Sequence, residues 1–286
     1  MHVWLDGDIL VFRAGFAAEK TAYYLKSIAG EPKRFQYKKE ADQYIQEHGL
    51  NPALLESYRE VEPLPNALHT VKLMLYSLQE ALQVTKDEIT ICLSGSDNFR
   101  YHVAKTKPYK GNRDAAHRPT HEKAIRDYLI NQYTTVISDG EEADDYIGRQ
   151  HYAMWVQDPE STCIATLDKD LNMIPGLHYN FSTNKSYVID KKQANYIFWK
   201  QLLTGDPTDN IPGIPKMGPV TAERILANVD EEDYAQVVAN EYKKAYGDGW
   251  EEKMTEMGRL IWIRRREDEW WSVEGLCLEG LCLEHT

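Results

Sequence analysis

The sequence has few cysteines and no long apolar run. Among its 286 residues, Cys92 and Cys163 lie in apolar, strand-like runs, whereas Cys277 and Cys282 have no second ligand pair beside them. This usage indicates neither a disulfide framework nor a zinc cluster. No stretch reaches the roughly 18 apolar residues of a membrane span, and the charged start MHVWLDGD argues against a secretory signal. We expect a soluble, cytoplasmic protein without a membrane partner.

Basic residues are also in deficit, and several enzyme motifs are missing. No Walker A, GxGxxG, HExxH or GxSxG pattern supports the chemistry that these motifs carry. A net charge of −12 argues at first sight against a polyanionic partner. However, the segment Arg100–Arg126 holds eight basic and two acidic residues, which makes it +6 and the rest −18. The charge distribution therefore allows a nucleic acid to bind at this segment.

Short apolar runs alternate with segments long enough for helices. The runs cover residues 2–5, 88–93, 134–137 and 161–167. This alternation predicts an α/β fold with a mainly parallel central sheet flanked by helices. The helical spacing of apolar residues over Leu68–Val84 predicts a helix.

Two other regions differ from this pattern. Residues 20–66, rich in Lys, Glu and Tyr, are predicted to be a partly helical insertion whose purpose the sequence does not reveal. After Gly205 the chain changes to Pro/Gly turns and helices, expected at 219–228 and around 251–266. We therefore predict a catalytic domain over 1–205 and a helical region over 206–286.

Acidic residues follow three of the predicted elements. Asp6 and Asp8 follow the first strand, and Asp168 and Asp170 follow another. If the extended backbone continues that far, both members of each pair face the same side. The crevice beyond the carboxyl ends of parallel strands is where ligands bind in such sheets. The third group is the run Glu141, Glu142, Asp144 and Asp145.

The acidic run also has a purely structural interpretation. Ser138 with Glu141 fits a capping box, and acids in a first turn favour the helix dipole. Capping explains one or two acids but not four, because Glu142 and Asp145 share a face and repel each other. A cation would resolve this repulsion. Oxygen-only ligation suits Mg²⁺ or Mn²⁺, and two such ions can hydrolyse a phosphodiester.

Two further segments suit a phosphate backbone. Lys107–Arg113 combines cations, a flexible glycine and Tyr109, and either Tyr101 or Tyr109 could stack a base. A solvated charged loop is the alternative. In GIPKMGPVTA, Gly213, Lys216 and Gly218 precede a helix with Pro219 at its first position, where free backbone N–H groups can bind an anion.

Taken in order, these pieces resemble the 5′-nuclease superfamily of flap endonucleases and bacteriophage 5′ to 3′ exonucleases. The similar segments are LDGD, FR with YKGNR, EEADD, LDKDL, GDPTDN and GIPKMGPVTA, spanning about residues 3–228, and the later MGRLIWIRRRED is similar to the phage members. The resemblance implies a divalent-metal-dependent enzyme acting on DNA with 5′ ends, flaps or overhangs. It also implies a helical arch near 98–126 and a C-terminal helix-hairpin-helix-type module. We expect a monomer in the cytoplasm, that of the host cell if the protein is encoded by a phage.

The resemblance also implies residue roles. Two metal ions, Mg²⁺ or Mn²⁺, are implied at Asp6, Glu142, Asp144, Asp145, Asp168, Asp170, Asp206 and Asp209. Lys110 and Arg113 are implied to contact the scissile phosphate. The DNA-binding set comprises Arg100, Lys105, Tyr109, Lys110, Gly213, Lys216 and Gly218, with a potassium ion at the hairpin. The family usually has one more aspartate before FR, where this chain has Ser94 or Gly95, so either Asp97 substitutes or one metal binds less tightly.

Two alternatives remain. A phosphatase of the haloacid dehalogenase type would use Asp6 as nucleophile and Asp8 as general acid. It leaves EEADD, YKGNR and the glycine hairpin without a role, and Leu10 stands where a Thr or Val is usual. A catalytically silent DNA-binding relative is disfavoured because nearly all the expected carboxylates are present.

Overall fold

The computed structural model describes residues 1–26, 31–113 and 118–276, in a chain that divides into two compact units. Unit 1 comprises residues 1–9, 77–117 and 132–286, and unit 2 comprises residues 10–76 and 118–131. The residues on both sides of position 205 belong to unit 1. The domain boundary expected there stays a prediction.

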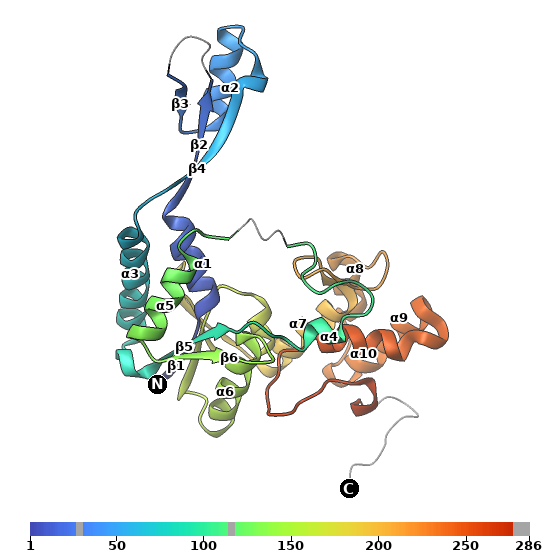
Figure 1. The fold of residues 1–286 in the computed structure, drawn as a ribbon. Helices are drawn as coiled ribbons and strands as arrows, with labels where there is room; N and C mark the ends of the chain where they lie inside the picture. The colour runs from blue at the N-terminus through green and yellow to red at the C-terminus, as the bar shows by residue number, and fades with distance from the viewer. Residues whose placement is uncertain (27–30, 114–117, 277–286) are drawn as a thin grey trace. The chain divides into compact units, whose positions relative to one another are not determined.

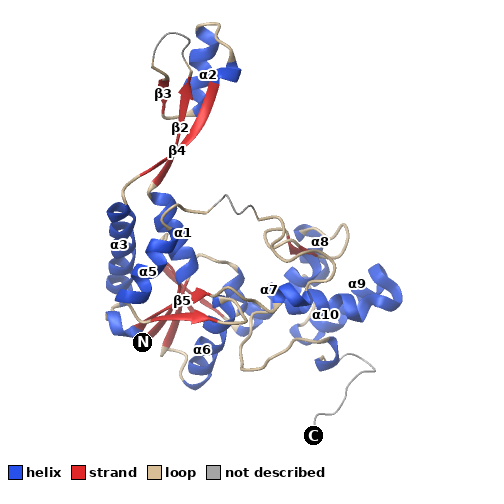
Figure 2. Ribbon diagram, viewed as in Figure 1, coloured by secondary structure: helices blue, strands red, loops and turns tan. Residues whose placement is uncertain are grey.

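A six-stranded sheet forms the centre of unit 1 (Figure 2), with the order β6-β5-β1-β7-β8-β9. Its strands are β1 (His2–Asp6), β5 (Ile89–Ser94), β6 (Thr135–Ser138), β7 (Thr162–Ala165), β8 (Gly176–Asn180) and β9 (Lys185–Ile189). All neighbours are parallel except β8 and β9. The mainly parallel sheet and the four predicted strands are confirmed. β8 and β9 were not predicted, because their short sequences GLHYN and KSYVI lack a sustained apolar run.

One helix of unit 1 packs against the sheet, and most of the others follow the sheet in sequence. α6 (Ala143–Gln157) packs across β1, β5 and β7. The others are α4 (Arg100–Val103), α7 (Lys191–Thr204), α8 (Pro219–Leu226), α9 (Tyr234–Tyr246) and α10 (Trp250–Ile261). Short 3₁₀ turns are η2 (Lys86–Glu88), η3 (Asp170–Met173), η4 (Glu231–Asp233), η5 (Gly247–Gly249) and η6 (Val273–Gly275). Pro219 begins α8, as predicted.

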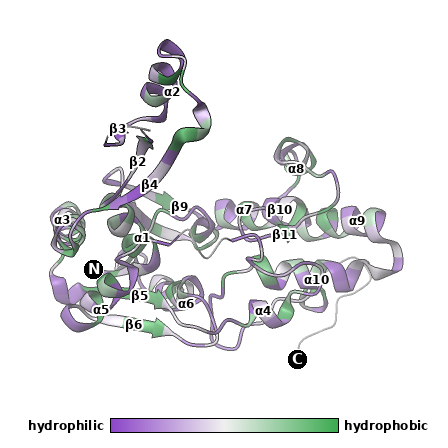
Figure 3. Cartoon of the chain, turned by 45° about the horizontal axis from the view of Figure 1, so that its top comes forward, coloured by the Kyte–Doolittle hydropathy of each residue, from purple (hydrophilic) through white to green (hydrophobic). Residues whose placement is uncertain are grey.

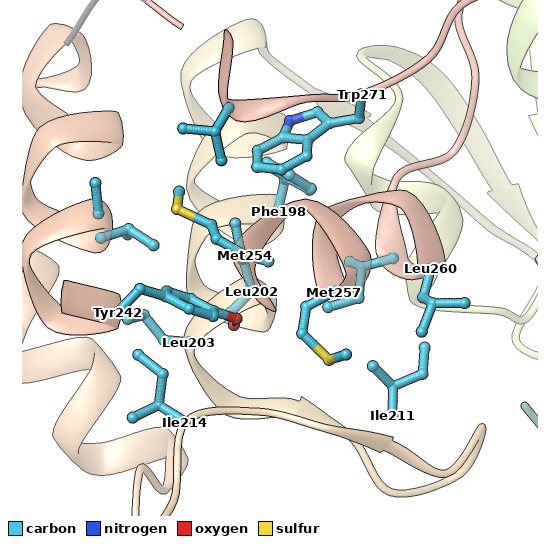
Figure 4. Close-up of a cluster of buried hydrophobic side chains, with 14 of the residues drawn as sticks. Phe198, Leu202, Leu203, Ile211, Ile214, Tyr242, Met254, Met257, Leu260 and Trp271 are labelled. Atoms are coloured by element: carbon cyan, nitrogen blue, oxygen red, sulfur yellow. The ribbon is translucent and has the colours of Figure 1, made fainter. Parts of the chain in front are cut away.

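The helices after the sheet share one apolar core (Figure 4). Phe198 and Leu202 from α7 lie with Tyr242 from α9 and Met257 from α10. Trp271 covers them so closely that a Cβ on Gly258 would lie 2.1 Å from its ring. Figure 3 shows hydrophobic and hydrophilic residues alternating along α10, as expected of a helix with one buried face. Since each large apolar side chain contributes about 1.5–3 kcal/mol on burial, this core holds the helices firmly.

A small antiparallel ladder, β10 (Gly205–Asp206) with β11 (Ile211–Pro212), connects α7 to the turn before α8. Gly205 has a φ of +71°, and a Cβ there would lie 2.2 Å from the Gly213 nitrogen. A Cβ on Gly213 would lie 2.1 Å from the Thr204 carbonyl carbon. The two backbone segments can therefore cross only because both positions are glycine.

Unit 2 contains three helices and a small module that lies between the first two of them in sequence (Figure 1). The helices are α1 (Gly7–Ala17), α3 (Leu64–Leu82) and α5 (Glu122–Gln132), of which α1 begins, and α3 and α5 end, in unit 1. The module has strands β2 (Glu19–Leu25), β3 (Lys33–Phe35) and β4 (Leu55–Val61), with α2 (Lys38–Glu47) and η1 (Pro52–Leu54). α3 confirms the predicted helix over 68–84. The insertion is partly helical as predicted, but its three strands were missed because charged residues conceal their alternation.

The predicted helical arch near 98–126 includes residues 114–117, which lie outside the described residues. Of the described part, residues 100–103 form α4 and residues 104–113 form turns and irregular backbone. Among the described helices, none is both long and apolar enough to cross a membrane.

Candidate active site

A cleft of about 370 Å³ lies where residues that follow β1, β6 and β7 meet. Ile9 follows β1, Asp144 follows β6 and Asp168 follows β7 in sequence, and all three residues line the cleft. The polar and charged side chains that line it include Arg100, Tyr109, Lys110, Arg113, Glu142, Asp144, Asp168, Asp170, Gln201, Asp206 and Asp209. Six of the eight predicted acids, Glu142, Asp144, Asp168, Asp170, Asp206 and Asp209, therefore line one cleft near the carboxyl ends of the parallel strands, where ligands bind in such sheets, whereas Asp6 and Asp145 are buried and are not part of its lining.

Asp6 and Asp8 do not point the same way. β1 ends at Asp6 and α1 begins at Gly7, so the expected continuation of extended backbone through Asp8 is wrong. A Cβ on Gly7 would lie 2.7 Å from the Cys92 carbonyl oxygen, so glycine lets the helix start directly against β5. Asp6 is 3 % exposed and accepts hydrogen bonds from the Ile9 amide and the Thr166 hydroxyl. Asp8 instead accepts one from the Ser94 amide at 2.9 Å.

Asp168 and Asp170 also lie beyond extended backbone, yet both line the cleft. β7 ends at Ala165, the Asp168 amide donates to the Thr166 hydroxyl, and η3 begins at Asp170. The Asp170 amide donates to Asp168 Oδ1 at 2.8 Å. The strand-based expectation that both face one side by alternation is wrong, because a turn, not a pleat, brings the two carboxylates together.

One group of acids lacks cationic partners. Asp6, Asp144, Asp168, Asp170 and Asp206 make no ion pair within the part of the chain that the structure describes. Burial, with the charge of Asp8, raises the pKa of Asp6 to about 7. Burial and the charges of Asp168 and Asp206 raise the pKa of Asp170 to about 7. Burial, then Asp6 and Asp168, raise the pKa of Asp144 well above its usual value. Burial is the largest cause in all three cases, and neighbouring carboxylates add to it, so an added cation would stabilise the ionised forms.

A second group of acids is neutralised by the chain itself. Lys110 Nζ pairs with Glu142 and lies 3.6 Å from Asp209, and Arg113 pairs with Asp209. The Tyr109 hydroxyl donates to both carboxylates, at 2.9 and 2.8 Å. Burial alone would raise the pKa of Glu142, but Arg100 and Lys110 bring it below its usual value. Glu142 is thus held ionised, and Asp209 is held in place by Arg113 and Tyr109.

Arg100 and Asp145 form a buried pair behind this group. Arg100 is 2 % exposed, donates to both Asp145 oxygens at 2.5 and 3.0 Å, and also donates to the carbonyls of Leu260 and Trp262. Asp145 is fully buried and further accepts from the Glu142 and Arg264 amides. Direct DNA contact by Arg100 and metal ligation by Asp145 do not fit these positions. The pair instead ties α6 to the end of α10.

Tyr109 also occupies a position that differs from the expected one. Only 5 % of it is exposed, and its ring belongs to the apolar core of the C-terminal helices. A base cannot stack on a ring enclosed in this way, whereas Tyr101 is 53 % exposed.

Ser138 donates to the Glu141 carbonyl, and the N-cap of α6 is Glu142, so the capping box predicted from Ser138 and Glu141 is wrong.

The segment leading to Lys110 is anchored from α10. Glu256, 8 % exposed, accepts hydrogen bonds from the Lys105 and Thr106 amides at 2.7 and 2.6 Å, and from the Thr106 hydroxyl at 2.6 Å. At the other end, the Lys110 amide donates to the Asp209 carbonyl at 2.9 Å. Lys105 itself is exposed, so its side chain is free to face solvent.

The glycine turn presents Lys216 at the surface. Lys216 is exposed and has a φ of +64°, and Gly218 is the N-cap of α8. Gly213 is required by its crossing with Gly205. This geometry suits the predicted anion site at a helix N-terminus, although the turn lies outside the cleft lining.

The position before FR carries no carboxylate that reaches the cleft. A Cβ on Gly95 would lie 2.3 Å from the Ser138 carbonyl oxygen, and Ser94 Oγ accepts from the Ala143 amide. The Asp97 side chain is 63 % exposed, lies 3.9 Å from His102 and is absent from the cleft lining. Asp97 therefore does not substitute for the missing aspartate in this structure.

The donor chemistry of the cleft fits a hard divalent cation. Asp6, Asp144, Asp168, Asp170 and Asp206 offer oxygen atoms only, which suits Mg²⁺ or Mn²⁺ and not zinc. In the described residues, no three His, Cys, Asp or Glu side chains are already arranged to hold an ion.

Sequence reasoning missed three contributors: Thr166, which bridges Asp6 and the Asp168 amide, Gln201, which donates to Asp170, and Glu256. Thr166, directly after β7 and two residues before Asp168, could have been found from its position. Nothing in the local sequence around Glu256 points to residues 105–106.

Comparison with known proteins finds relatives that match about half of this chain and solved structures with a similar fold. No family model matches the chain. It is 33 % identical over 168 residues to a 5′-3′ exonuclease of Buchnera aphidicola subsp. Schizaphis graminum, covering 54 % of this chain and 58 % of that protein. It is 32 % identical over 155 residues to DNA polymerase I of Rhizobium leguminosarum, covering 48 % of this chain and 14 % of that protein.

The fold is similar to two solved structures. One is the T5 D15 protein co-crystallised with metal ions, with a TM-score of 0.54, 16 % identity, and coverage of 91 % of this chain and 88 % of the other. The second is T5 5′-exonuclease with bound zinc ions, with a TM-score of 0.51 and the same identity and coverage. At this identity the likeness concerns the fold alone.

Proposed function

We propose that this chain belongs to the 5′-nuclease superfamily, which the motifs, the curated relatives and the fold support together, and that it is a divalent-metal-dependent 5′ to 3′ exonuclease or flap endonuclease acting on DNA. The observation that carries the proposal is the cleft in which four carboxylates without an ion pair among the described residues, those of Asp144, Asp168, Asp170 and Asp206, lie beside a separate group of acids neutralised by Lys110 and Arg113. A relative named 5′-3′ exonuclease agrees with it, although the chain spans only 58 % of that protein.

The proposed metal ligands are Asp6, Asp144, Asp168, Asp170 and Asp206, with Glu142 and Asp209 at the border of the cluster. Two ions, Mg²⁺ or Mn²⁺, would supply an activated water and stabilise the leaving oxygen of the phosphodiester. Thr166 orients Asp6, and Gln201 orients Asp170. Because Asp97 does not reach the cleft, we favour the alternative in which one of the two ions would bind less tightly.

Lys110 and Arg113 are the proposed contacts to the scissile phosphate. Both cations already lie beside the acids, so their charge is available where negative charge develops on the phosphoryl oxygens. Tyr109 and Arg100 act as positioning residues, the first by holding Glu142 and Asp209 and the second by holding Asp145. The Gly213–Gly218 turn, with Lys216 and a potassium ion, is proposed to hold duplex DNA in a monomeric enzyme.

The test is cleavage of a 5′-labelled duplex with an overhang, measured with Mg²⁺ and with EDTA. A generic phosphomonoester is assayed in parallel. We expect metal-dependent release of label from DNA and no comparable turnover of the phosphomonoester.

The opposite pattern would favour the phosphatase, in which Asp6 attacks phosphorus. Its geometry is unfavourable here, because Asp6 is 3 % exposed and Asp8 is held by the Ser94 amide. Binding of DNA without cleavage of either substrate would indicate the silent relative and refute the proposal.

A further inference from the structure

The small module of β2, β3, β4 and α2 is not needed to build the central sheet. It has its own apolar core, in which Leu25 and Phe35 from the strands pack with Ala41 and Ile45 from α2. Its ends meet, because Glu19 pairs with Val61 across antiparallel strands and the Glu62 amide donates to the Ala18 carbonyl at 2.8 Å. A self-contained module that enters and leaves the fold at one point calls for a role of its own.

A concave surface of about 480 Å³ lies on this module. Three cations line it, Lys20, Arg34 and Lys38, together with Tyr23 and Tyr37. Among the described residues, no acidic side chain lines it. In a chain of net charge −12, a concave surface lined by cations and tyrosines favours an anionic ligand that also carries aromatic rings.

The cations of this surface are able to exchange partners. The Lys20 side chain is 63 % exposed and pairs with Glu62, and the Arg34 side chain is 47 % exposed and pairs with Glu60. The single-contact pair of Lys20 contributes little to stability, so a phosphate can compete for that cation. Arg34 donates to both Glu60 oxygens, so it is the cation held more firmly in place. For Lys38 no ion pair is found in the described residues, and Tyr37, directly before it, is 59 % exposed.

We propose that this surface, walled by Lys20, Arg34, Lys38, Tyr23 and Tyr37, is a second DNA-binding site that takes single-stranded DNA by its backbone and bases. Cations beside aromatic rings are the combination that binds single strands without sequence preference. Duplex DNA is disfavoured, because its bases are already stacked on each other and do not offer their faces to Tyr37. The choice of DNA rests on the proposed function, whereas the surface does not involve the metal cleft.

The test is binding of a labelled single-stranded oligonucleotide to the full chain in EDTA, followed by fluorescence anisotropy. Tyr37→Ala should weaken binding about fivefold to a hundredfold, the range expected for one lost stacked base. Tyr76→Ala is the matched control, since Tyr76 is similarly exposed at 61 % but does not line the surface. Lys38→Ala should lower the slope of log affinity against log salt by about 0.7. Lys39→Ala, a neighbouring exposed lysine outside the lining, should lower it less.

Equal effects of Tyr37→Ala and Tyr76→Ala, or of Lys38→Ala and Lys39→Ala, would overturn the proposal. An equal loss of duplex affinity in Tyr37→Ala would also overturn it, because stacking on a free base would not be involved. Cleavage with Mg²⁺ is measured on the same proteins. If the parent chain binds through Tyr37 but cuts no DNA, the proposed nuclease function fails and the second site stands; if it cuts DNA while Tyr37→Ala binds normally, the reverse holds.

Discussion

The two halves of the cleft differ in how their negative charge is handled. On one side Asp144 and Asp170 have raised pKa values and no ion pair among the described residues, as does Asp6, which is buried and not part of the cleft lining. On the other side Glu142 and Asp209 are paired with Lys110 and Arg113 and share the Tyr109 hydroxyl. The contrast shows that acids in one cleft serve two purposes: the unpaired ones require an external cation, and the paired ones position the chain's own cations.

The largest effect should come from removing charge on the unpaired side. In the double variant Asp168→Asn/Asp170→Asn, single-turnover cleavage should fall by more than the roughly hundredfold to thousandfold loss of one preorganised donor. DNA binding should change little, because neither residue is a proposed phosphate contact. Quench-flow cleavage together with binding in the presence of Ca²⁺ measures both quantities. A double variant that digests DNA at the parent rate would remove these residues from the site.

The next effect tests the paired side. Lys110→Ala should lower the single-turnover rate about a hundredfold to a thousandfold at saturating enzyme and Mg²⁺, because it removes charge beside the reacting phosphate. Lys105→Ala is the control, since Lys105 is exposed and only its backbone is anchored, by Glu256. It should weaken binding and leave this rate unchanged. A slow Lys105→Ala with a normal Lys110→Ala would reverse the assignment.

A third effect concerns stability and pH. Asp6 and Asp170 have folded-state pKa values of about 7, above the unfolded value of 3.8, so they take up protons on folding. Their contribution is lost as pH rises through 7, by roughly 1 kcal/mol each between pH 6.5 and 8.5. Burial lowers the pKa of His151 to about 3 and of His178 to about 4; because their unfolded pKa is 6.5, each adds back roughly 0.4 kcal/mol between pH 6.5 and 8.5, which offsets part of the loss.

Calorimetry in EDTA should therefore show Tm falling by several degrees from pH 6.5 to pH 8.5. Mg²⁺ should raise Tm more at pH 8.5 than at pH 6.5, because the ion binds the ionised carboxylates. Asp168→Asn/Asp170→Asn should abolish most of that difference. A Mg²⁺ shift independent of pH would mean that the unpaired acids do not bind the ion.

The smallest effect lies outside the cleft, at the glycine turn. Lys216→Ala should lower the salt slope of duplex binding by about 0.9 and leave the single-turnover rate unchanged. Exposed Lys185, in β9 far along the sequence from the turn, provides the matched substitution Lys185→Ala. Identical slopes for the two variants would exclude a phosphate contact at Lys216.

Local sequence predicted the parts of the fold that depend on local patterns. Apolar runs identified β1, β5, β6 and β7, and acids after these strands identified the cleft, because parallel strands end at one edge. The direction of single side chains was harder. Asp8 was misjudged because the strand gives way to a helix at Gly7, where close contact with β5 decides the backbone.

Contacts between distant segments could not be predicted. The resemblance implied a DNA contact at Arg100, yet this side chain donates to the Leu260 carbonyl, 160 residues away, and is buried by that packing. Glu256 reaches Lys105 and Thr106 in the same way. Charge and spacing show what a side chain can bind, whereas tertiary packing determines which partner is within reach.

The crossing of Gly205 and Gly213 has a consequence for where a cut falls. Asp206, in the cleft, directly follows one glycine, and the turn with Lys216 begins at the other. Because the two backbones touch without intervening side chains, little relative movement is open to them. Under the proposed function, the distance between the turn and the acids is therefore fixed. This distance sets the number of nucleotides between the bound duplex and the cleaved bond, and the number does not vary with the length of the 5′ strand.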